Sequence, residues 1–273
     1  MNKERYEDIV NSIIKQAPME CGVQSLVYMM LYDIIREKYK DNEVGIIVAD
    51  LRNKLSIFGG AGGVVDLCVV SKEFKYKPIP LENSDDIEKF GNEKVVRMLK
   101  KYDYWEKELN EESNLSMDAR IKQRKENLKK WNDELKKEFD TNKTRRLGCV
   151  EVKSVNIELP ENIWQLAGHI IEYKRVLYTN GLKWQFFDFA SLEEGVKNEF
   201  ESLFKKYDMM LDKKIKCTNQ DIIKVSEQLK EKIYTEYGLK KWEIELVKNN
   251  QFVKNFNDLF IELRNNISGI KWK

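Results

Sequence analysis

The spacing of apolar positions predicts two helices at the start of the chain. Apolar side chains recur at helical intervals within residues 2–16 and again from about residue 19 to residue 39. Pro18 stands between the two patterns and separates them, because proline lacks the amide hydrogen that a helix interior needs. Apolar residues spaced by three and four positions form one stripe, so each helix is expected to pack on a core through one side.

Short apolar runs bounded by turn residues predict strands further along. Residues 64–70 follow the glycine-rich turn Gly59–Gly63, and residues 74–81 alternate aromatic and polar side chains as an edge strand does. Because a strand rather than a helix follows the glycines, they are interpreted as a turn and not as a phosphate cradle. Residues 45–48 fit either a short strand or the start of a helix.

A helix and a hairpin are predicted after residue 160. Pro160 stands near the start of a helix that runs from about residue 163 to residue 174, a position that proline favours. Thr179–Gly181 then forms a turn between two strands, residues 176–178 and 183–189. Asn-Gly in such a place is the strongest short signal of a β-hairpin.

Two further segments are predicted to be helical. Residues 84–146 are densely charged, with apolar positions at helical spacing, which predicts an inserted helical hairpin with coiled-coil-like packing. Its tryptophans, Trp105 and Trp131, are interpreted as core anchors rather than base-stacking platforms. The chain after residue 192 is also expected to be helical, in three pieces.

These elements predict an α/β fold, with a mixed central sheet flanked by helices. The α/β core comprises residues 1–83 and 147–190, residues 84–146 are the inserted hairpin, and residues 191–273 form a helical C-terminal region.

Composition narrows the range of functions. The 273 residues include 48 basic and 46 acidic side chains, so the net charge of +2 creates no overall field that would attract a polyanion. The four cysteines are far apart, and the single histidine, His169, is interpreted as a packing or hydrogen-bonding residue rather than a ligand. Zinc sites and a Ser-His-Asp triad are therefore not expected. A signal peptide and a membrane-spanning run are both missing, which favours a soluble, cytoplasmic protein.

The run Cys149–Ser154 carries the most informative chemistry. In a strand, Glu151 and Lys153 lie on one face, roughly 7 Å apart along the chain, while Val150 and Val152 face a core. A buried carboxylate and amine are costly unless they pair with each other or hold a metal ion. This pair is therefore a candidate site.

Other polar residues could converge on this pair. Glu20 opens the second helix, Asp66 lies in the strand after the glycines, and Gln165 lies in the helix after residue 160. Carboxylates together with a main-chain carbonyl form a hard oxygen site that suits Mg²⁺ or Mn²⁺. Such an ion and a neighbouring lysine are the groups that phosphodiester hydrolysis requires.

These residues resemble the PD-(D/E)XK nuclease superfamily, the restriction-endonuclease-like fold, and most of all the nuclease region of type I restriction R subunits. The similarity covers about residues 17–81 and 146–190. The residues that carry it are Asp66, Glu151-Val152-Lys153-Ser154, Trp164-Gln165-Leu166 with Tyr173, and Leu177-Tyr178-Thr179-Asn180-Gly181-Leu182-Lys183-Trp184.

The resemblance implies a role for each site residue. Asp66 and Glu151 would hold the metal ion with the carbonyl of Val152, and Lys153 would serve the attacking water. Glu20 would add a further acidic group, and Gln165 would support the site. The chain departs from the family in the long separation of Asp66 from Glu151, which the inserted hairpin has to fill. It also lacks a GxxxxGK[ST] phosphate loop, so no nucleotide cofactor is expected.

The first functional hypothesis is a metal-dependent DNA endonuclease, which the resemblance places in restriction or mobile-element defence. A homodimer would supply the two sites that cutting both strands requires. Phosphate contacts are expected from basic residues of the hairpin, which give affinity without reading sequence. These residues include Lys122, Arg124, Lys125, Lys129 and Lys130.

Other interpretations stay open. The chain could be a catalytically inactive nuclease-fold protein that acts as a protein- or DNA-binding module, or it could be a nuclease that acts on RNA. Glu151 and Lys153 could form an ion pair on an exposed strand. Asp66 could cap a loop, Glu20 could complement its helix dipole, and Gln165 could be a surface amide.

Overall fold

The computed structural model describes residues 1–16, 18–39, 43–49, 58–74, 141, 143–249 and 251–272. The chain divides into two compact units. The first comprises Met1–Leu51, Phe58–Glu73 and Arg146–Lys273, and the second comprises Arg52–Ile57 and Phe74–Arg145. Nearly all of the second unit lies outside the described residues, and with it most of the predicted edge strand at 74–81 and of the predicted helical hairpin at 84–146.

The first unit is a mixed α/β structure, as predicted from the sequence. Two short two-stranded sheets accompany the main sheet: β2 (Gly59–Gly60) with β3 (Gly63–Val64), and β9 (Val247–Lys248) with β10 (Gln251–Phe252). The helices are α1 (Lys3–Gln16), α2 (Glu20–Lys38), α6 (Ile163–Tyr173), α7 (Glu194–Leu211), α8 (Asn219–Glu231), the π-helix η3 (Lys232–Glu236) and α9 (Phe256–Gly269).

A six-stranded mixed sheet forms the centre of this unit, with the strand order β1-β4-β5-β6-β7-β8. Among the described strands, β5 and β6 are parallel, and every other neighbouring pair in this sheet is antiparallel. A parallel pair needs a crossover, which α6 supplies. The strands are β1 (Val44–Val48), β4 (Leu67–Ser71), β5 (Arg146–Val152), β6 (Arg175–Thr179), β7 (Lys183–Asp188) and β8 (Lys240–Glu245).

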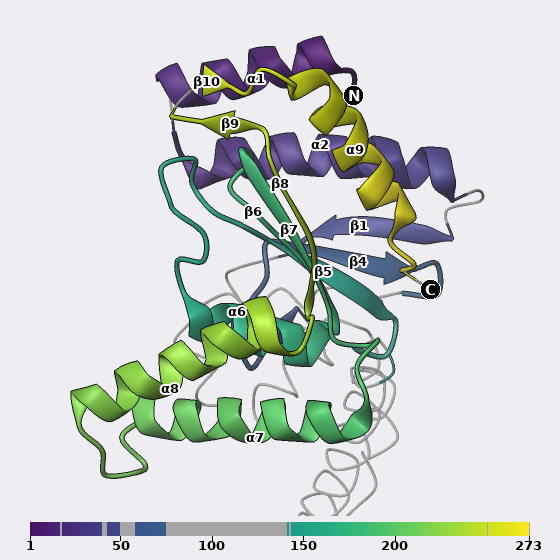
Figure 1. Ribbon diagram of the computed structural model, residues 1–273. Coiled ribbons are helices and arrows are strands. Elements are labelled where there is room, and N and C mark those ends of the chain that lie inside the picture. The colour runs from purple at the N-terminus through teal and green to yellow at the C-terminus, as the bar shows by residue number, and fades with distance from the viewer. Residues whose placement is uncertain are drawn as a thin grey trace, which may run out of the picture. The chain divides into compact units, whose positions relative to one another are not determined.

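Helices cover both faces of the sheet (Figure 1). Helices α1, α2 and α9 lie on one face, and α6, α7 and α8 lie on the other. Alternate residues of β5 serve the two layers: Val150 and Val152 belong to the apolar core beneath α2. Because side chains alternate along a strand, Glu151 faces the α6 layer.

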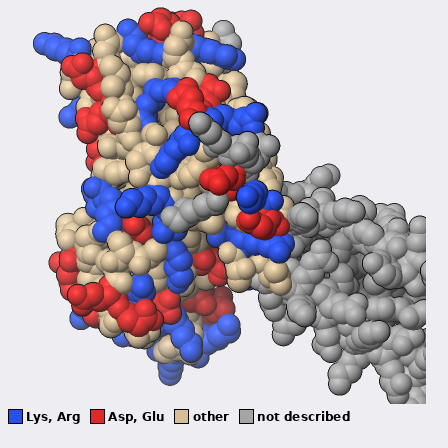
Figure 2. All heavy atoms as spheres, turned by 90° about the vertical axis from the view of Figure 1, so that its right-hand side faces the viewer, with Lys and Arg blue, Asp and Glu red and all other residues tan. Residues whose placement is uncertain are grey.

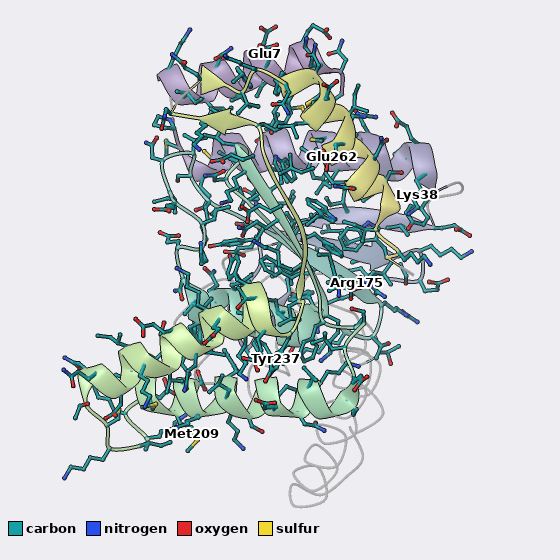
Figure 3. The ribbon with its side chains drawn as sticks, viewed as in Figure 1. Glu7, Lys38, Arg175, Met209, Tyr237 and Glu262 are labelled. Carbon is teal, nitrogen blue, oxygen red and sulfur yellow. The ribbon has the colours of Figure 1, made fainter. Side chains whose placement is uncertain are left out.

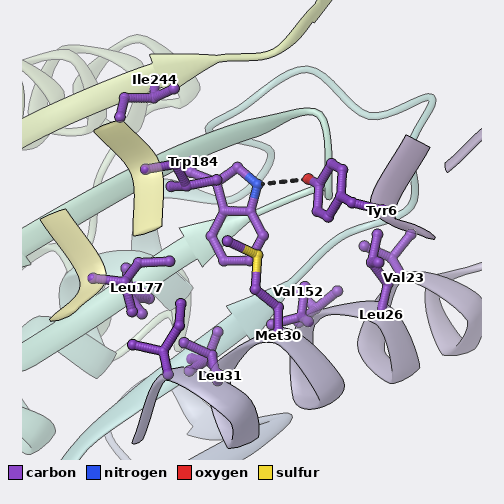
Figure 4. Packing of buried hydrophobic residues seen from close by; sticks show 14 of the residues in the cluster. Tyr6, Val23, Leu26, Met30, Leu31, Val152, Leu177, Trp184 and Ile244 are labelled. Atoms are coloured by element: carbon purple, nitrogen blue, oxygen red, sulfur yellow. Dashed lines mark hydrogen bonds between the residues drawn. The ribbon is translucent and has the colours of Figure 1, made fainter. Parts of the chain in front are cut away.

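In the core beneath α2, hydrogen bonds connect α1 to the predicted hairpin of β6 and β7. In this core, Trp184 of β7 donates a hydrogen bond from Nε1 to the Tyr6 hydroxyl at 3.0 Å (Figure 4). The Tyr6 hydroxyl in turn donates to the carbonyl of Gly181, which has a φ of 79° in the turn between β6 and β7. The left-handed φ explains the value of glycine at this turn, and the predicted Asn-Gly hairpin is confirmed.

The end of α2 is hydrogen-bonded to the end of the C-terminal helix α9. Lys38, at the end of α2, donates hydrogen bonds to the carbonyls of Ser268 and Ile270 at the end of α9 (Figure 3). Such contacts use carbonyls that a helix C-terminus leaves without an intrahelical partner.

In the described part of the chain, none of the helices has the length and apolar character that a membrane crossing requires.

The C-terminal region differs from the helical region expected for residues 191–273. Residues 240–245 form β8, the sixth strand of the central sheet, and β9 and β10 follow before α9. In β8 the side chains of Trp242 and Ile244 are more buried than those of Lys241, Glu243 and Glu245. That alternation has the period of two that a strand requires. It covers so few residues that the charged helical pattern on either side hides it in the sequence.

Candidate functional site

Neighbouring strands bring Asp66 and Glu151 together. Leu67 pairs with Val150 in the antiparallel register of β4 and β5. Asp66 precedes Leu67 and Glu151 follows Val150, so the two acids occupy adjoining positions of the two strands. Residues directly opposite each other in an antiparallel pair point to the same face. The long separation of the two acids in sequence therefore does not keep them apart in space.

Asp66 is held against β5 by a hydrogen bond. Its Oδ2 accepts from the main-chain N–H of Val152 at 2.7 Å, and only 5% of the residue is exposed. Burial and the negative charge of Glu151 raise the pKa of Asp66 to about 8, although the hydrogen bond from Val152 opposes the rise. After burial, the charge of Glu151 is the largest cause of this rise, because like charges at adjoining positions repel each other.

Glu151 and Lys153 form a buried pair, as their spacing predicts. Lys153 Nζ lies 2.8 Å from Glu151 Oε1, and the two residues are 7% and 2% exposed. Burial disfavours the charged amine, but the charge of Glu151 and its hydrogen bond outweigh that effect and raise the pKa of Lys153. The amine therefore remains protonated at neutral pH. An exposed cross-strand ion pair is not what these residues form.

Helix α6 completes the surroundings of the amine. Asn162 caps the helix by accepting a hydrogen bond from the main-chain N–H of Gln165 at 3.2 Å, a common way to fix a helix start. Gln165 Oε1 then accepts a hydrogen bond from Lys153 Nζ at 2.9 Å. Gln165 is one of the predicted site residues, and the structure brings it into direct contact with Lys153.

His169 is a site residue that the sequence analysis did not include. It lies one turn after Gln165 on α6, is fully buried, and places Nε2 3.1 Å from Glu151 Oε2. The two atoms are close, but they are not aligned as a hydrogen bond. The spacing of four residues from Gln165 was the available signal, because residues i and i+4 share one face of a helix.

Glu20 and Glu161 lie at the exposed margin of the site. Glu20 is the first residue of α2. Desolvation raises the pKa of Glu20, Lys153 opposes the rise, and Glu151 and Glu161 add to it. Glu161 Oε2 is 3.6 Å from Lys153 Nζ. The charges of the site therefore influence the pKa of Glu20. Among the described residues, none forms a direct hydrogen bond with the Glu20 side chain.

The donor set suits a hard divalent cation. Asp66 and Glu151 supply carboxylate oxygens, and a cation between them would offset the repulsion that raises the pKa of Asp66. Across the described ranges, however, no three His, Cys, Asp or Glu side chains gather closely enough to form a complete metal-binding group. The Val152 side chain points into the opposite core, so only its main chain could contribute.

The predicted DNA-contacting residues cannot be placed with the site. Lys122, Arg124, Lys125, Lys129 and Lys130 all lie outside the described residues. On the face of the molecule seen in Figure 2, basic and acidic side chains of the described residues are interspersed.

Comparisons of the chain with protein-family models, with curated proteins and with solved structures found no match.

Proposed function

We propose that this chain is a metal-dependent endonuclease that hydrolyses DNA phosphodiester bonds on a restriction-endonuclease-like scaffold. The observation that carries the proposal is the convergence of Asp66, Glu151 and Lys153 on one face of β4 and β5. Two buried acids beside a protonated amine are costly for stability alone. A reaction that uses all three groups accounts for their presence.

The order of elements around the site supports the same proposal. Helix α2 precedes three antiparallel strands (β1, β4 and β5), and α6 then crosses over to the parallel strand β6. This mixed sheet with helices on both faces agrees with the architecture that the resemblance implies. The role in restriction or mobile-element defence rests on the resemblance.

In this mechanism Asp66, Glu151 and the Val152 carbonyl would hold Mg²⁺ or Mn²⁺. The ion would supply Lewis acidity, which polarises a phosphoryl oxygen and lowers the pKa of a bound water. Lys153 would orient the attacking water and stabilise negative charge on the phosphorane. Because its amine is protonated, Lys153 acts in this mechanism as a charge stabiliser rather than as the general base. Gln165 holds the amine in place.

The test is plasmid nicking with Mg²⁺ or Mn²⁺. Asp66→Asn and Lys153→Ala should each lower the nicking rate by at least about 100-fold, the scale expected when one transition-state contact is removed. Lys174→Ala is the matched control, because Lys174 forms an exposed ion pair with Glu201 away from the site and should keep full activity. Equal nicking by wild type and both site variants would exclude this site as the source of the activity.

A second function, a catalytically inactive binding module, is favoured by one observation. The mixed charges in Figure 2 and the net charge of +2 suit protein contact at least as well as DNA contact. Failure of the wild-type protein to cut plasmid, linear duplex, single-stranded DNA or RNA with either ion would favour this module. Cleavage of RNA alone would instead assign the site to a ribonuclease.

A further inference from the structure

Unpartnered polar atoms concentrate at the proposed site. In the described part of the chain, five buried side-chain polar atoms lack a hydrogen-bond partner, and three of them are Glu151 Oε2, His169 Nδ1 and His169 Nε2. Leaving a buried polar atom without a partner is costly, so each instance calls for a physical explanation. Two of these three atoms, Glu151 Oε2 and His169 Nε2, face each other at 3.1 Å.

The packing around α6 fixes the imidazole beside Glu151. Gly62, in the turn between β2 and β3, lies so close that a Cβ there would approach His169 Nδ1 to 2.8 Å and the Gln165 carbonyl to 2.3 Å. Gly168 meets the main chain of the same turn, because its Cβ would lie 2.3 Å from Gly62 N. The turn thus closes over one side of the imidazole and leaves Nε2 facing Glu151.

The two oxygens of Glu151 have different neighbours. Oε1 receives the hydrogen bond from Lys153 at 2.8 Å, whereas Oε2 lies 3.1 Å from His169 Nε2. Glu151 is therefore hydrogen-bonded through Oε1, and its Oε2 lies against the imidazole without the alignment of a hydrogen bond. A lysine just after its own strand and a histidine on the facing helix together limit the orientations open to this carboxylate.

We propose that His169 is a positioning residue that orients Glu151 through Nε2 and thereby sets the affinity of the site for a divalent cation. The inference rests on the proposed metal-dependent function. Groups that orient the ligands of a metal ion usually contribute 10- to 100-fold to metal affinity or activity. His169 occupies that position with respect to Glu151, and no step of the proposed hydrolysis requires it to touch the substrate.

The experiment measures Mn²⁺ binding to the full-length chain by calorimetry, without DNA. His169→Leu removes both nitrogens. His169→Asn keeps a polar group that ends short of the Nε2 position, and His169→Gln carries an amide nitrogen to about that position. We expect His169→Leu and His169→Asn to weaken Mn²⁺ binding by about 10- to 100-fold. The Mn²⁺ affinity of His169→Gln should stay within about threefold of wild type.

A further variant separates positioning from simple destabilisation. Ile170→Val shortens a fully buried side chain on the same helix and should leave Mn²⁺ affinity unchanged. Thermal unfolding of every variant identifies any that do not fold. If His169→Leu fails to fold, the Mn²⁺ affinities of His169→Asn and His169→Gln still test the positioning role.

The outcomes distinguish this inference from the nuclease proposal. Wild-type affinity in all three His169 variants overturns the positioning role and leaves the nuclease proposal intact. If His169→Leu and His169→Asn weaken Mn²⁺ binding and the wild-type protein cuts no nucleic acid, the positioning role is supported and the nuclease proposal is overturned. A wild-type chain that binds no Mn²⁺ overturns both.

Discussion

Asp66 is a buried acid placed beside a second acid. Burial and the charge of Glu151 raise its pKa to about 8, far above the ordinary value of 3.8. Between these two values the folded protein holds a proton on Asp66 that the unfolded chain releases. Folding is therefore linked to proton uptake in this pH range.

This linkage predicts how stability depends on pH without divalent ions. Because the folded pKa is raised, the stabilising contribution is fully present below about pH 4 and is lost as pH rises through about 8. The slope contributed by Asp66 reaches at most about 1.4 kcal/mol per pH unit. In Asp66→Asn the free energy of unfolding should fall less steeply with rising pH, by up to that slope. Urea unfolding at several pH values measures the difference.

Asp66→Asn is a suitable probe because its amide oxygen can still accept the hydrogen bond from the Val152 N–H. If the free energy of unfolding of Asp66→Asn falls as steeply as that of wild type between pH 4 and pH 8, Asp66 is ionised across this range in the folded wild-type protein.

The sequence was informative for some site residues and not for others. Strand alternation predicted that Glu151 and Lys153 share a face, because the period of two is local. The neighbourhood of Asp66 and Glu151 depends on strand pairing, which no local pattern encodes. It was expected from the order of the elements, and the resemblance implies it as well. For His169 the sequence predicts a packing or hydrogen-bonding residue rather than a ligand. Its contact with Glu151 depends on how α6 docks on the sheet, which tertiary packing decides.

Two glycines control how α6 docks on the hairpin formed by β2 and β3. Gly168 and Gly62 approach so closely that a Cβ on either would overlap main-chain atoms of the other element. Such an approach is open only to glycine. The glycine-rich run interpreted as a turn therefore acts as a packing surface for the helix that carries Gln165 and His169.

At this contact, Gly168→Ala should destabilise the protein by about 1–3 kcal/mol, the usual cost of forcing extra atoms into a packed interior. Gly195→Ala is the matched control. Gly195 also lies in a helix, but a Cβ there would meet nothing within 4 Å, so the gain in helix propensity should raise stability by up to about 1 kcal/mol. Chemical unfolding of both variants gives the comparison. Equal effects would contradict a packing role for Gly168.

Element prediction succeeded where the pattern was long or the turn chemistry strong. Helices α1, α2 and α6 and the hairpin of β6 and β7 match the expected residues closely. Residues 45–48, left open between strand and helix, belong to β1. The single strand predicted at residues 64–70 is divided between β3 and β4, and Asp66 lies between them. The sequence does not predict the C-terminal strands β8, β9 and β10. The few alternating residues of β8 stand among charged helical sequence, and its place is fixed by pairing with β7.

In the whole chain, the segment between β4 and β5 joins the sheet at the end opposite Asp66 and Glu151. Strand β4 runs from Leu67, beside Asp66, to Ser71, and β5 runs back from Arg146 toward Glu151. Val70 pairs directly with Arg146. The two strand ends that carry the intervening segment are therefore neighbours, and antiparallel neighbours can be joined by a short turn.

Replacing residues 75–140 with a short Gly-Ser linker should therefore leave a folded protein. Shortening the connection lowers its closure cost by about 0.6 kcal/mol for each halving of its length. We expect cooperative thermal unfolding at or slightly above the wild-type midpoint, followed by circular dichroism. If Lys122, Arg124, Lys125, Lys129 and Lys130 contact DNA as proposed, DNA affinity should fall in the same protein. Loss of cooperative unfolding would mean that the first unit depends on the segment it carries.

The attachment of this segment to the far ends of β4 and β5 has a consequence for how the protein can change. The chain leaves β4 at Ser71 and returns at Arg146, so these two covalent connections lie at the ends of β4 and β5 opposite Asp66 and Glu151. In the nuclease that we propose, the length of this connection can therefore change without altering the strand register that places the two acids side by side.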